Sequence, residues 1–120
     1  MKKTPWLFAI ITLPLIVITG CSKENNGGGG GTTVNCSLVT NKAFAADVNP
    51  VIQTVCAAAG CHANGSSNGP GALTNYAQVF SARAQIRSAV SSGLMPQGST
   101  LSSSQKNSIL CWIDSGAPNN

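Results

Sequence analysis

The chain has 120 residues, only 8% of them charged, and a formal net charge of +4. Two of its seven basic residues stand at the extreme N-terminus, and no basic cluster alternates with aromatic residues, so the pattern of a nucleic-acid-binding surface is absent. A chain of this length accommodates one small domain after a short N-terminal segment.

The first twenty residues have the layout of an export signal. Two lysines precede an apolar run at residues 6–19, which is short for a membrane span but typical of a signal-peptide core. The run leads into ITGC at residues 18–21, which resembles the lipobox of bacterial lipoproteins. The resemblance implies that residues 1–20 are a lipoprotein signal peptide and that Cys21 carries the lipid. Ordinary cleavage near Gly20, leaving a free thiol, is the alternative.

Residues 21–32 are expected to be a tether. They include five consecutive glycines, Gly27–Gly31, and such a segment has nothing to bury. A Gly-rich coil of about eleven residues has a root-mean-square reach of about 20 Å. The domain at residues 33–120 is therefore expected outside the cytoplasm and close to a membrane, at a periplasmic face or a cell surface. Without the leader, five basic residues face three acidic ones, a net charge of +2.

The sequence of this domain predicts an all-α fold, because no segment shows convincing alternation of apolar and polar residues. Asn49 and Pro50 have the pattern of an N-cap and a first helical residue. Val51, Ile52 and Val55 follow on one helical face, and this helix is expected to run through the next cysteines and to stop near residues 64–65.

Three further segments complete the predicted helical fold. After a Ser/Asn/Gly/Pro-rich loop at residues 65–71, Thr74 or Asn75 is expected to cap a short helix, and residues 82–90 form the next. Residues 94–98 have the composition of a turn. The last helix follows a capping box at residues 102–105 and is terminated by a glycine and a proline.

Four cysteines remain after Cys21 is assigned to lipid. Export implies an oxidising compartment, where disulfides persist. Cys36 and Cys111 lie 75 residues apart near the two ends of the domain, and a bond between them would be worth about 4 kcal/mol on the loop-entropy model. Cys56 and Cys61 form a close pair.

The domain is poor in large side chains. It contains four aromatic residues, Phe44, Tyr76, Phe80 and Trp112, among many alanines, serines and glycines. Domains this small seldom become stable on side-chain packing alone and usually need a disulfide, a metal or a cofactor. A buried porphyrin would supply the missing apolar surface.

The segment from Cys56 to His62 has the composition of a haem-attachment motif. Haem c needs two thiols and an imidazole next to the second, usually as Cys-x-x-Cys-His. Here four small residues separate Cys56 from Cys61, and His62 is the chain's single histidine. Apart from the initiator, Met95 is the single methionine, and a thioether is a soft ligand suited to haem iron.

From about Phe44 to Pro118 the chain resembles a class I, single-haem cytochrome c domain of the kind found in secreted or lipid-anchored bacterial proteins. The resemblance rests on VNPVI at residues 48–52, on SGLMP at residues 92–96, and on the closing segment at residues 101–117. It implies about four short helices around one haem, with the first and last helices crossing. The inter-cysteine loop is two residues longer than the usual form.

Site roles follow from the same resemblance. It implies that haem c is attached through Cys56 and Cys61, and that His62 and Met95 are the axial iron ligands. With two protein ligands the iron has no open position, so an electron carrier is expected rather than an enzyme. Its expected partners are redox proteins near the membrane, and the chain is expected to be a monomer. Arg83 and Arg87, four residues apart, are candidate partners of the haem propionates.

Two other interpretations remain open. A zinc site would gather cysteines with His62, although the adjacent Cys61 and His62 would both have to reach one ion. A disulfide-stabilised binding or scaffold lipoprotein would instead pair Cys56 with Cys61 and contain no haem. A catalytic cysteine with His62 as its base is weaker, because sequence neighbours rarely present that geometry.

Overall fold

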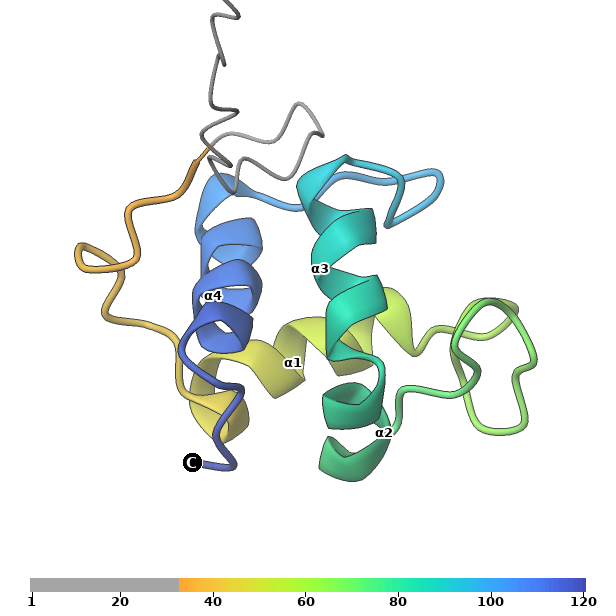
Figure 1. Cartoon of the computed structure of the whole chain (residues 1–120). Coiled ribbons are helices and arrows are strands. Elements are labelled where there is room, and N and C mark those ends of the chain that lie inside the picture. The colour runs from red at the N-terminus through yellow and green to blue at the C-terminus, as the bar shows by residue number, and fades with distance from the viewer. Residues whose placement is uncertain (1–32) are drawn as a thin grey trace, which may run out of the picture.

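The computed structural model describes residues 33–120, and within that range the chain forms helices and no strand. The first helical segment consists of a π-helical turn Phe44–Val48, α1 Asn49–Val51 and a second π-helical turn Ile52–Cys56. The later helices are α2 Tyr76–Ser81, α3 Arg83–Ser91 and α4 Ser103–Asp114 (Figure 1). The predicted all-α class is confirmed for these residues. The signal peptide, the lipidation site at Cys21 and the Gly-rich tether lie outside them.

The first helical segment begins six residues earlier than the sequence predicts, at Phe44 with Ala43 as the N-cap. The backbone N–H of Ala43 donates to Asp47 Oδ2 at 2.9 Å, while the Asn49 side chain accepts from Gln53 Nε2 and caps nothing. Pro50 has no N–H to donate and crowds the preceding turn, and the helix is π-wound on either side of α1. Asn49 as an N-cap is therefore wrong.

The same segment also ends earlier than expected. It stops at Cys56 instead of residues 64–65, because Ala57 leaves the helical conformation and Gly60 takes a positive φ of 81°. A left-handed residue of this kind is compatible with a turn and interrupts a helix. The two cysteines are consequently separated by a turn-rich loop, and His62 lies beyond the helix.

The later helices follow their predicted signals closely. The Asn75 side chain accepts from the Gln78 backbone N–H at 3.0 Å and caps α2. Ser102 and Gln105 form the predicted capping box, in which each side chain accepts a hydrogen bond from the other residue's backbone N–H. These caps satisfy N–H groups that a helix leaves without an intrahelical partner.

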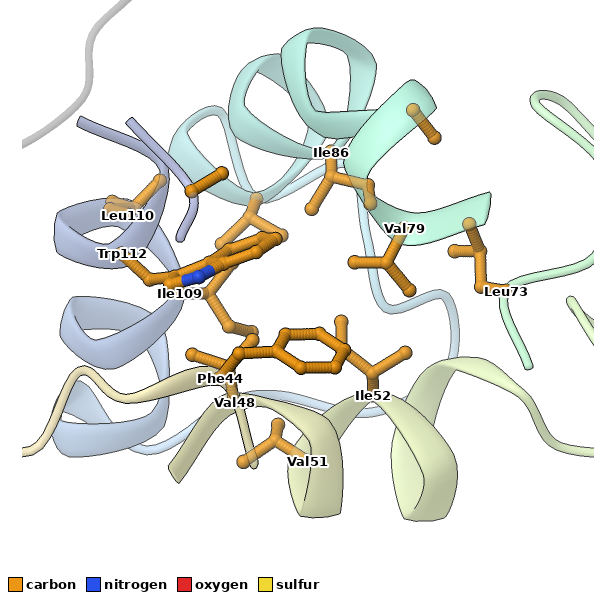
Figure 2. Packing of buried hydrophobic residues seen from close by; sticks show 13 residues of the cluster. Phe44, Val48, Val51, Ile52, Leu73, Val79, Ile86, Ile109, Leu110 and Trp112 are labelled. Carbon is orange, nitrogen blue, oxygen red and sulfur yellow. The ribbon is translucent and has the colours of Figure 1, made fainter. Parts of the chain in front are cut away.

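The core lies where α4 meets the first helical segment. Figure 1 shows α3 and α4 side by side and the first segment running crosswise to them. The ring of Trp112, which is fully buried, lies 5.2 Å from that of Phe44 (Figure 2), and Phe44 in turn lies 5.0 Å from Tyr76. Trp112 Nε1 donates to Pro118 O and the Tyr76 hydroxyl donates to Ala117 O, so the buried polar atoms of both rings are satisfied.

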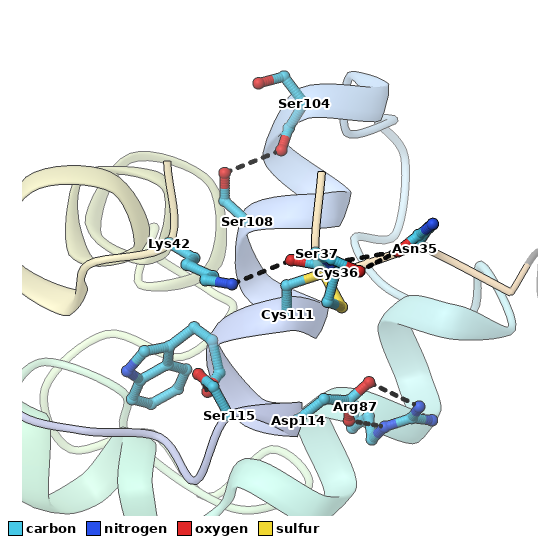
Figure 3. The surroundings of a disulfide bond; sticks show 11 residues. Asn35, Cys36, Ser37, Lys42, Arg87, Ser104, Ser108, Cys111, Asp114 and Ser115 are labelled. Carbon is cyan, nitrogen blue, oxygen red and sulfur yellow. Dashed lines mark hydrogen bonds and ion pairs between the residues drawn. A yellow bond between two sulfur atoms is a disulfide. The ribbon is translucent and has the colours of Figure 1, made fainter. Parts of the chain in front are cut away.

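The predicted disulfide between Cys36 and Cys111 is confirmed. It joins a turn before the first helix to the C-terminal half of α4, where Cys111 is fully buried (Figure 3). Within the same N-terminal segment Lys42 Nζ donates to Cys36 O at 2.9 Å, and Asn41 Nδ2 donates to Ser108 Oγ of α4 at 3.1 Å. The N-terminal part of the domain is thereby fixed against α4. None of the helices at residues 33–120 is both long and apolar enough to cross a membrane.

Candidate functional site

A cavity of about 750 Å³ lies between the Cys-His segment, α3 and the loop that follows α3. Cys56, Cys61, His62 and Met95 all line it. The structure therefore brings together four residues that the sequence marked as candidates. Its volume falls within the range of about 300–1,000 Å³ that small-molecule sites usually span.

The His62 ring is held by the backbone on one side. The side chain is only 7% exposed, and its Nδ1 lies 2.8 Å from Gly71 O. A carbonyl oxygen only accepts, so Nδ1 is the donor, and in the neutral ring Nε2 keeps its lone pair. No residue in the described part of the chain forms a hydrogen bond with Nε2. His62 is thus prepared to act as a ligand through Nε2.

The backbone of His62 is anchored as well. Its N–H donates to Cys56 O at 3.0 Å, and its carbonyl accepts from Leu73 N–H at 2.9 Å. The first bond ties the histidine to the end of the helical segment, and the second ties it to a buried core residue. The ring is therefore positioned from both directions along the chain.

The two cysteines are unpaired and differ in exposure. Cys56 is half-buried, whereas Cys61 is exposed. Burial raises the pKa of the Cys56 thiol, and the negative charge of a nearby Cys61 thiolate raises it further. Both thiols remain available for covalent chemistry, and Cys61 is the more accessible one.

These residues do not gather around one ion. Within residues 33–120, no group of three or more His, Cys, Asp or Glu residues is placed to hold a metal ion. A zinc site of the Cys₃His type needs four such ligands at about 2.0–2.3 Å from one centre. The arrangement of Cys56, Cys61 and His62 gives this interpretation no support.

Met95 reaches the cavity from a separate element. It is half-buried in the loop between α3 and α4, and its N–H donates to Ala89 O at 3.1 Å. This bond attaches the loop to α3, and Pro96 follows directly. The histidine and the thioether are thus supplied by two different segments of the same cavity wall.

The cavity wall carries no charged side chain. Its polar groups are the amides of Asn68, Gln85 and Gln97 and the hydroxyl of Ser88, and the rest is largely apolar. Such a wall could accommodate the apolar ring of a porphyrin, and the charged propionates would meet neutral amides there. The donor set and the lining both fit a porphyrin held by His62 and Met95.

Neither candidate arginine lines this cavity. Arg87 Nε and Nη2 donate to the two carboxylate oxygens of Asp114 at 2.6 and 3.0 Å, which links α3 to α4. The Arg83 guanidinium lies 4.1 Å from the Phe80 ring centroid and donates to Phe80 O. Both side chains have structural contacts elsewhere.

The sequence interpretation missed the residues that hold the Cys-His segment from outside. Gly71 accepts from the His62 ring, while Ser66 and Asn68 bond to carbonyls of the inter-cysteine loop. The available signal was the cluster of Ser, Asn and Gly at residues 65–71, which indicated a loop but not what the loop contacts.

The search for relatives adds nothing to this geometry, since no protein-family model, no curated protein and no solved structure matches the chain.

Proposed function

We propose that the protein is a membrane-tethered c-type cytochrome that carries one electron at a time. The observation that carries the proposal is His62, whose ring is fixed through Nδ1 by Gly71 O and whose Nε2 is left without a hydrogen-bond partner among the described residues. A metal-ligating histidine usually donates its other ring N–H to a carbonyl or carboxylate in this way.

The other residues of the cavity have complementary roles. Cys56 and Cys61 would form the thioether bonds, and Met95 would join His62 in holding the iron. A bound haem would supply one-electron redox chemistry through its iron. The chain's own contribution is to hold the imidazole, to supply the thioether, and to surround the pigment with neutral and apolar groups. Those two ligands leave no coordination position for a substrate.

The arrangement of the helices is compatible with a small cytochrome c-like fold. The first helical segment packs against α4, and the Cys-His segment follows directly from its end. Both features are expected of that fold. The likeness to a cytochrome c domain rests on this arrangement and on the sequence motifs at residues 48–52, 92–96 and 101–117.

The proposed location is outside the cytoplasm, on a lipid anchor at Cys21. The Cys36–Cys111 disulfide supports it, because such bonds persist in oxidising compartments. A domain on a short tether would exchange electrons with redox proteins near the same membrane.

The decisive experiment is to express the full chain in a host that matures c-type cytochromes. A red protein whose haem stays attached on denaturation, with a haemochrome spectrum for two thioethers, is the expected result. The double variant Cys56→Ala/Cys61→Ala should lose covalent haem, whereas Cys36→Ala should retain it. A folded, colourless wild-type chain with a Cys56–Cys61 bond would overturn the proposal.

That last outcome defines the second candidate function, a haem-free scaffold lipoprotein. One observation favours it: Cys56 and Cys61 lie close enough for the charge of one to raise the pKa of the other. Oxidation of the pair would give the domain a second disulfide. The His62 contact and the position of Met95 would then have no role.

A further inference from the structure

The inter-cysteine loop is held by two side chains that lie outside it. Asn68 Nδ2 donates to Gly60 O at 2.9 Å and to Cys61 O at 3.0 Å. The Ser66 hydroxyl donates to Cys61 O as well. The two carbonyl groups that flank the Cys61 side chain, those of Gly60 and of Cys61 itself, are thus fixed by residues five to eight positions further along the chain.

The segment that supplies these donors is itself tightly bonded. Ser66 N–H donates to Ala63 O at 3.0 Å, and Asn68 N–H donates to the Ser66 hydroxyl at 3.2 Å. Gly71 N–H donates to Asn68 O at 2.9 Å, and Gly71 O accepts from the His62 ring. One set of hydrogen bonds therefore connects the inter-cysteine loop to the His62 ring.

Apart from these side chains, the loop is held by main-chain bonds, including the bond from the His62 N–H to Cys56 O that joins its two ends. Residues 57–60 are three alanines and a glycine, and a side chain built on Gly60 would meet nothing within 4 Å. Within it, the Cys61 N–H donates to Ala58 O at 3.0 Å. Each backbone residue that must be ordered opposes folding by its conformational entropy, and this loop is longer than the usual attachment motif by two residues.

We propose that Ser66 and Asn68 are positioning residues that hold Cys61 where it can form the second thioether bond. We call this pair the carbonyl latch. The inference rests on the proposed haem function and extends it, because it explains how a Cys-x4-Cys-His spacing presents both thiols to one porphyrin edge. In the bond-forming step the Cys61 S–H adds across a haem vinyl group, so that sulfur bonds to one carbon and hydrogen to the other.

The first test counts thioether bonds in holoprotein made in a maturing host. Asn68→Asp keeps the side-chain shape, removes both donated bonds and sets a carboxylate against two carbonyl oxygens. Asn64→Asp is the matched control, since Asn64 is exposed in the same region and forms no side-chain hydrogen bond with the described residues. Ser66→Ala and Asn68→Ala remove latch bonds without adding charge.

We expect the ratio of singly to doubly attached haem, measured by mass spectrometry, to rise about tenfold in Asn68→Asp and severalfold in Asn68→Ala and Ser66→Ala. Asn64→Asp should match the wild type. The thermal midpoint should change little in all four variants. A parallel fall in thermal midpoint and total haem at an unchanged ratio would show a merely structural role and overturn the inference.

A second measurement separates the latch from the haem. The full chain can also be made in a host that attaches no haem. In that form, hydrogen exchange at the Cys61 and His62 amides should be about tenfold faster in Asn68→Asp than in the wild type, and should equal the wild-type rate in Asn64→Asp. Equal exchange in both variants and the wild type overturns the latch. A wild-type chain that acquires no haem in the maturing host overturns the proposed function instead, whatever the exchange rates are.

Discussion

His62 Nδ1 lies 2.8 Å from the backbone carbonyl oxygen of Gly71. The contact decides which nitrogen of the neutral ring is basic, because the carbonyl oxygen only accepts a hydrogen bond and Nδ1 must donate it. Gly71 has a φ of 89°, which a residue with a side chain rarely adopts, and a Cβ there would meet Ser66 O at 3.4 Å. The position of the acceptor therefore depends on a glycine.

The first prediction concerns the tautomer of His62 in the chain without haem. Nitrogen NMR of the neutral ring should show a protonated Nδ1 and an unprotonated Nε2. Free histidine prefers the opposite tautomer, so the result reports the Gly71 contact. Gly71→Ala should shift the population toward protonated Nε2. A wild-type ring protonated at Nε2 would contradict the geometry.

The second prediction concerns Met95 in the proposed haem-bound protein. Met95→Ala should abolish the weak near-red absorption band and lower the reduction potential by on the order of 0.1 V, within the ~0.8 V range that axial ligands set. The control is Leu38→Ala, because Leu38 is 79% exposed and does not line the cavity.

The Leu38→Ala variant should keep both the band and the potential. If Met95→Ala retains the band, or if both variants lose it equally, Met95 is not the ligand. Redox titration followed by absorption measures the two properties on one sample.

The third prediction concerns the Cys36–Cys111 bond. The double variant Cys36→Ala/Cys111→Ala should lose about 4 kcal/mol of unfolding free energy, since the unfolded chain is no longer closed over 75 residues. Alanine is chosen because Cys111 is fully buried and a serine hydroxyl there would need a partner. Urea unfolding of oxidised and double-variant chains measures the difference. A loss of unfolding free energy below about 1 kcal/mol would show that the unfolded chain gains little conformational freedom when the disulfide is removed.

The helix caps that the sequence predicts correctly depend on short-range contacts. Asn75 and Ser102 cap helices through bonds to residues three positions away, and such pairs are visible in a local window. The start at Asn49 is wrong because Phe44 and Val48 are buried against α4, and this tertiary packing extends the helix backwards.

In the candidate site, too, the sequence predicts what depends on residue type and misses what depends on tertiary contacts. Residue chemistry marked His62 and Met95, because the chain offers one histidine and one internal methionine. The contacts made by Asn68 and Gly71 depend on the path of an irregular loop, which has no periodicity to read. The partner of Arg87 could not be read from the sequence for a similar reason, since Asp114 lies 27 residues away on another helix.

The last prediction concerns pH and Cys56 in the chain without haem. Burial favours the neutral thiol, so the folded pKa lies above the ordinary value of 9.0. The folded chain then binds this proton more tightly than the unfolded chain does. Its contribution to stability is complete below about pH 9 and is lost as the pH rises through the folded pKa.

Unfolding free energies measured from pH 7 to pH 10.5 should accordingly fall less steeply in Cys56→Ser than in the wild type. Cys61→Ser should keep most of the wild-type slope, because burial is the larger cause of the raised pKa and the Cys61 charge the smaller. Alkylation at neutral pH should modify the exposed Cys61 severalfold faster than Cys56. Equal slopes in all three chains would mean that Cys56 is as well solvated in the folded state as in the unfolded state.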